Sequence, residues 1–91
     1  MSYGNIVIPP GETLKEAMET RGIGKEELAK NMNISESFLE SLLNGEAKLT
    51  NEVALRLEAV IGIPAYFWRN LEAKYRQELS KERMRITING K

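Results

Sequence analysis

Residues 25–45 hold two short helical patterns of apolar residues with only a few residues between them. The apolar positions recur at the i, i+3 and i+4 spacing of one helix face: Leu28, Ala29 and Met32, then Leu39, Leu42 and Leu43. Asn33 tolerates the left-handed conformation that ends a helix, and Ser35 is a good N-cap for the next one. We therefore expect helices over Lys25–Met32 and Glu36–Asn44 that cross closely at the small Ala29. The N-terminal outer face of the second helix should then project from the domain.

Three further helices are predicted around this pair. The first runs from Gly11 to about Arg21, the fourth covers Asn51–Ile61 after the cap Thr50, and the fifth begins at Pro64. Glycines follow the first and fourth helices, where a helix stop is needed. With 91 residues there is room for one domain. The expected fold class is all-α, with five helices over residues 1–79.

Residues 80–91 are expected to form a basic C-terminal tail or a short strand. Met84–Ile88 alternates apolar and polar residues, which is the strand period, and Asn89-Gly90 is typical of a turn. Such a strand could pair with the apolar run 6–8 or cross a dimer. An unstructured tail is the alternative.

The composition argues against catalysis and against a metal site. The chain has no His and no Cys, and all 13 acidic residues are Glu. This removes the usual general base, the thiol nucleophile and the common zinc ligand sets, so we expect neither an enzyme nor a cofactor. No apolar run is long enough to span a membrane, and a cytoplasmic protein is expected.

Two short helices with a tight turn are the arrangement by which a recognition helix enters the major groove of DNA. The segment KEELAKNMNISESFLESLLNG, followed after four residues by Thr50, resembles the helix-turn-helix of Xre/Cro-type transcriptional regulators. The likeness covers residues 8–79 and includes PPGE, LLNG, NEVALRL and FWRNLEAKY. With these motifs the chain is similar to the HigA-type antitoxins, also known as VapI or plasmid-maintenance antidote proteins.

The resemblance implies a five-helix, lambda-repressor-like fold that binds a double-stranded DNA operator as a homodimer. It also implies repression of the protein's own operon and binding of a ribonuclease toxin. By matching position, the candidate DNA-contacting residues are Lys25, Ser35, Glu36, Ser37, Phe38, Ser41, Asn44, Lys48 and Thr50. The alternative is a protein-binding module with weak or no DNA binding. It would neutralise a toxin or form the N-terminal regulatory domain of a longer ImmA/IrrE-like protein.

Each candidate residue also has a purely structural interpretation. The lysines and serines could be solvated surface, Ser35 is needed as an N-cap in any case, and Phe38 could pack on a neighbouring helix. The recognition helix carries Glu36 and Glu40 but no Arg or Lys. Because phosphate neutralisation supplies most non-specific affinity, we expect DNA binding to be weak, steeply salt-dependent or reliant on the basic tail.

Charge and apolar residues are unevenly distributed along the chain. Residues 1–65 hold six basic residues and ten Glu, a net charge of −4, whereas residues 66–91 hold seven basic residues and three Glu, a net charge of +4. The fifth helix carries more apolar residues than one small domain needs, which suits a two-fold dimer if they are not simply core. The candidate dimer residues are Trp68, Leu71, Tyr75, Leu79, Met84, Ile86 and Ile88.

Overall fold

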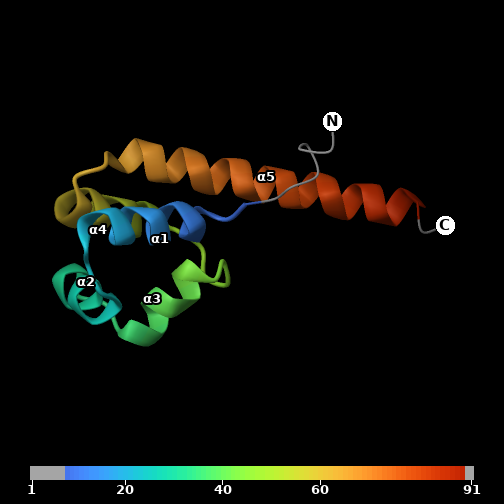
Figure 1. Cartoon of the computed structure of the whole chain (residues 1–91). Coiled ribbons are helices and arrows are strands. Elements are labelled where there is room, and N and C mark those ends of the chain that lie inside the picture. The colour runs from blue at the N-terminus through green and yellow to red at the C-terminus, as the bar shows by residue number, and fades with distance from the viewer. Residues whose placement is uncertain (1–7, 90–91) are drawn as a thin grey trace.

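Five helices make up the part of the chain that the computed structural model describes, residues 8–89 (Figure 1). They are α1 (Pro10–Arg21), α2 (Lys25–Met32), α3 (Glu36–Leu43), α4 (Asn51–Ile61) and α5 (Ala65–Asn89). Helix α5 packs on α4 and α1, while α3 packs on α1 and α2. Figure 1 shows α2 and α3 on the side of the molecule away from α5. The predicted all-α fold class is confirmed, and no helix among residues 8–89 is long and apolar enough to cross a membrane.

The ends of these helices follow from local backbone chemistry. Gly22, Asn33 and Gly62 have positive φ angles of 66°, 59° and 94°, the left-handed conformation that closes a helix. After α3, Asn44 keeps a right-handed conformation and Gly45 takes the positive φ of 79°. Helices α3 and α4 each begin at a hydroxyl N-cap, because Ser35 Oγ accepts from the Phe38 N–H and Thr50 Oγ1 accepts from the Val53 N–H.

The core lies where all five helices meet. Its largest fully buried side chains come from every helix: Leu14, Leu28, Met32, Leu39, Leu57 and Trp68. The Trp68 indole Nε1–H donates to the Ile63 carbonyl at 3.2 Å, so its polar atom is satisfied on burial. At the connection between α4 and α5, Glu58 Oε1 of α4 accepts a hydrogen bond from the Ala65 N–H, which fixes the start of α5 against α4.

The expected C-terminal strand is wrong. Residues 84–88 belong to α5, which extends to Asn89. The helical domain therefore does not end at residue 79, as we expected from the sequence. An alternation of five residues is a weak signal, and a strand needs a partner to satisfy its backbone groups. A helix already formed adds one internal hydrogen bond for each residue it gains. The apolar run 6–8 proposed as a partner lies outside the described residues, apart from the exposed Ile8.

Two contacts hold the helix-turn-helix against the rest of the molecule. At its C-terminal end, Gly11 of α1 is in direct contact with the last carbonyls of α3. A Cβ at this position would overlap the Leu43 carbonyl oxygen and lie 2.5 Å from that of Leu42. At the turn, Arg56 of α4 donates from Nη1 to the carbonyls of Met32 at 2.8 Å and Asn33 at 3.1 Å.

Replacing Gly11 by Ala should destabilise the fold, although Ala is the better helix former. A methyl group has no space between α1 and the backbone of α3, so we expect a loss of about 1–3 kcal/mol in the free energy of unfolding. Urea denaturation followed by circular dichroism measures it. Gly24→Ala is the control, since nothing lies within 4 Å of a Cβ there, and it should cost less than about 1 kcal/mol. Equal losses in the two variants would contradict the packing argument.

Replacing Arg56 by Met should loosen the turn between α2 and α3. Two carbonyls lose a charged donor, and a hydrogen bond from a charged group contributes roughly 1.5–3 kcal/mol, so we expect a loss near the lower end at this half-exposed site. The same urea experiment measures the loss. Lys74→Met removes an exposed charge from α5 and serves as the control. The role of Arg56 would be disproved by a variant as stable as this control.

Candidate nucleic-acid interface

Helix α3 presents one side to the core and the other to solvent. Leu39, Leu42 and Leu43 are buried and anchor the helix, whereas Glu36, Ser37, Phe38 and Glu40 are exposed. No other described part of the chain covers this outer face. The outer face of α3 can therefore contact a DNA groove or a partner protein without any rearrangement of the fold.

Several of the predicted contact residues also have structural roles. Ser35 and Thr50 accept backbone hydrogen bonds as N-caps, at 3.0 and 3.3 Å. Ser41 is half-buried, and its hydroxyl donates to the Ser37 carbonyl at 3.2 Å. Glu36, Ser37 and Phe38 thus remain as the predicted residues of the outer face of α3 whose side chains have no hydrogen bond or ion pair within the described structure. Phe38 is 37% exposed, so its side chain is partly available for contact.

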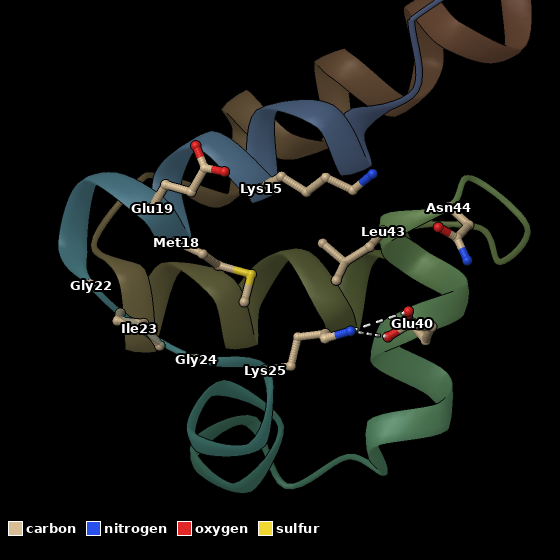
Figure 2. Close-up of a pocket in the computed structure, with 10 residues that line it drawn as sticks. All are labelled: Lys15, Met18, Glu19, Gly22, Ile23, Gly24, Lys25, Glu40, Leu43 and Asn44. Carbon is tan, nitrogen blue, oxygen red and sulfur yellow. Dashed lines mark hydrogen bonds and ion pairs between the residues drawn. The ribbon is translucent and has the colours of Figure 1, made fainter.

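Lys25, the first residue of α2, reaches across to α3. Its Nζ lies 3.0 and 3.3 Å from the two carboxylate oxygens of Glu40, and both side chains are half exposed. Figure 2 shows this pair at the side of a groove between α1 and α3. The ammonium that we predicted to meet a phosphate is therefore already paired with a carboxylate of the recognition helix.

The groove itself has a volume of about 640 Å³. Met18, Ile23 and Leu43 supply its apolar lining, and Figure 2 shows the Lys15 side chain extending along α1 toward α3. Asn44 lies at the α3 end, so this residue and Lys25 are brought together along one side of α3. Lys48 and Thr50 lie in the loop that follows; Lys48 is exposed and has no ion-pair partner among the described side chains of residues 8–82.

The seven residues predicted to form a dimer interface differ in how far the structure exposes them. Trp68 is 0% exposed and belongs to the core of this chain, so it offers no surface to a second copy. Leu71, Tyr75 and Leu79 are half-buried along α5. The remaining three, Met84, Ile86 and Ile88, lie on the helical backbone of α5, but their side chains are outside the described part.

Sequence reasoning did not assign two residues of this surface as site residues. Glu40 is one turn after Glu36 and three residues after Ser37, so the helical period alone would place it on the same face. Lys15 could not be found in this way, because its proximity to α3 depends on how α1 packs. Its ammonium lies 3.5 Å from Glu12, at the long end of an ion pair.

Comparison with known proteins places the chain in a family. The sequence pattern of the helix-turn-helix family matches residues 14–68. An Escherichia coli protein described as the uncharacterized HTH-type transcriptional regulator YddM is 36% identical over 63 residues, which cover 69% of this chain and 67% of that protein.

Solved structures agree with this assignment. An addiction module antidote protein of a HigA family from Coxiella burnetii has a TM-score of 0.75 and 32% identity, over 89% of this chain and 91% of that one. The Pseudomonas aeruginosa antitoxin HigA, solved with the higBA promoter, has a TM-score of 0.78 over 93% of this chain and 88% of that one, and its 24% identity supports the fold alone. The chain therefore belongs to the helix-turn-helix family of transcriptional regulators that includes the HigA antitoxins.

Proposed function

We propose that this protein binds a double-stranded DNA operator by inserting the outer face of α3 into the major groove. The observation that carries the proposal is the uncovered N-terminal half of α3 on a rigidly anchored helix pair. Ser37 can pair with several base edges, Glu36 can accept from a cytosine amino group, and Phe38 can pack on a thymine methyl. The described residues hold no cluster of three or more acidic residues suited to a metal ion.

Phosphate contacts come from the residues that flank α3. Lys25 lies beside Glu40 and lines the groove with Asn44 at the C-terminal half of α3, and Lys15 adds a cation along that groove. Lys48 and Thr50 follow in the loop after α3. The helix pair itself is acidic, with two Lys and four Glu over residues 25–45. A single copy therefore has few cations to offer, and a dimer would double them.

The relatives support the same proposal. The Escherichia coli relative is named a transcriptional regulator, and the Pseudomonas antitoxin was solved with promoter DNA. We propose that this chain likewise represses its own operon at an inverted repeat. As a member of the family that includes the HigA antitoxins, it would also bind and neutralise a ribonuclease toxin encoded beside it. These comparisons favour the regulator over a module that binds only protein.

A homodimer would use α5. Leu71, Tyr75 and Leu79 follow one another along this helix and stay half exposed, and Figure 1 shows α5 extending beyond the other helices. A second copy related by a two-fold axis could bury this stripe, with its own α3 placed for the next half-site about one DNA turn away.

Lys48→Ala should weaken binding to all sequences, whereas Ser37→Ala should change the preference among sequences. Lys48 would meet phosphate, so in a dimer its loss should lower the slope of log affinity against log salt by about 2. Electrophoretic shift of the protein's upstream DNA between 50 and 200 mM salt (roughly the range over which such contacts are lost) measures both effects. Lys74→Ala removes the same charge from exposed α5 and should change neither. Salt-insensitive binding by the wild type, or no binding at low salt, would refute the proposal.

Leu79→Glu should convert the dimer into a monomer. A charge in the buried stripe is costly to desolvate, so we expect sedimentation velocity to report a monomer and operator affinity to fall about tenfold or more. Gln77→Glu is the matched control, because it adds the same charge at an exposed position of α5. A monomeric wild type, or a Leu79→Glu variant that remains dimeric, would count against this interface.

A further inference from the structure

The Lys25–Glu40 ion pair differs from four other ion pairs of the described side chains. Those four join residues three or four apart within α1, α4 or α5. This pair joins α2 to α3 across 15 residues, and one ammonium contacts both oxygens of the carboxylate. It therefore ties the start of the first helix of the motif to the outer side of the second.

Glu40 is well placed to face DNA if α3 enters the major groove. It lies on α3 one turn after Glu36 and on the same face as Ser37, and half of its side chain is exposed. A bare carboxylate there would be repelled by phosphate. The positive charge of Lys25 offsets the charge of the Glu40 carboxylate. A carboxylate has about four acceptor positions, so the positions that do not face Lys25 can still accept a hydrogen bond from a base.

Lys25 has a donor to spare as well. An ammonium carries three N–H bonds, and two are directed to Glu40. The third can donate to a phosphate of the strand that passes the start of α2. The pair can thus contact the backbone through Lys25 and a base edge through Glu40 at once.

We propose, on the basis of the proposed DNA binding, that the Lys25–Glu40 pair reads a cytosine. Glu40 is the specificity-determining residue and accepts from the cytosine N4 amino group in the major groove. Lys25 is a positioning residue that fixes the carboxylate and neutralises it. Glu36 also faces outward but has no ion-pair partner among the side chains that the structure describes, residues 8–82, which makes it the matched comparison.

The test is selection from a library of duplexes with about 20 random base pairs, a length that covers two half-sites one helical turn apart. The selection uses five full-length proteins, each shown by circular dichroism to be folded: the wild type, Glu40→Gln, Lys25→Met, Lys25→Arg and Glu36→Gln. The wild type should select a C·G pair at one position of each half-site. Glu40→Gln should lose that preference in favour of adenine, with about tenfold weaker binding to the wild-type site. Glu36→Gln should leave the preference at that position unchanged, and any change that it causes should fall at the separate position that Glu36 contacts.

The lysine variants separate positioning from simple phosphate binding. Lys25→Met should broaden the preference at the Glu40-dependent position, whereas Lys25→Arg, which can keep the ion pair, should retain it. A Lys25→Met variant that binds every duplex more weakly by the same factor, and still selects the wild-type motif, would overturn the positioning role. A Glu40→Gln variant that selects the wild-type motif would overturn the inference as a whole. A wild type that enriches no sequence would instead remove the proposed function on which the inference rests.

Discussion

The position of the recognition helix depends on the close approach of α1 to the end of α3. Gly11 has no side chain, so α1 can lie directly against the carbonyls of Leu42 and Leu43. The same corner holds Gly45, where a Cβ would lie 3.1 Å from Pro9 and 3.4 Å from the Tyr75 hydroxyl. Three segments far apart in sequence thus meet at the C-terminal end of α3. With the Arg56 contact at the turn before α3, they fix the orientation of α3.

Three of the motifs that carry the resemblance described above meet at this corner. PPGE supplies Pro9 and Gly11, LLNG supplies the carbonyls and Gly45, and NLEAKY ends at Tyr75. None of these residues is on the outer face of α3. They are needed for the same physical reason, the tight junction of α1, α3 and α5, so the motifs indicate the shared fold more directly than they indicate which DNA is bound.

Local signals made most of the fold predictable. Residues 25–32 and 51–61 were predicted with their observed bounds, because Asn33, Thr50 and Gly62 act through their own backbone and side-chain preferences. The spacing of apolar residues in α5 did not predict which of them face the core of this chain. Trp68 and Leu71 are three residues apart, and this spacing is the same whether the helix face packs on the chain's own core or on a second copy. The length of α5 was underestimated because Met84–Ile88 also fits a strand. The Lys25–Glu40 and Arg56 contacts depend on tertiary packing, and the sequence shows only that the charges exist.

The placement of charge limits how the protein can gain affinity for DNA. The acidic helix pair has a net charge of −2 over residues 25–45. The basic residues of α5 whose side chains the structure describes are Arg69, Lys74, Arg76 and Lys81. They lie on a different side of the molecule from α2 and α3, because α5 packs on α4 and α1 (Figure 1). These four basic residues of α5 are therefore poorly placed to assist α3 of the same copy. Of the three lysines near α3, Lys25 is held by Glu40 and Lys15 lies 3.5 Å from Glu12, whereas Lys48 has no ion-pair partner among the described side chains. A recognition surface of this kind would draw less on bulk attraction to phosphate, and its selectivity would depend more on the few side chains that contact bases.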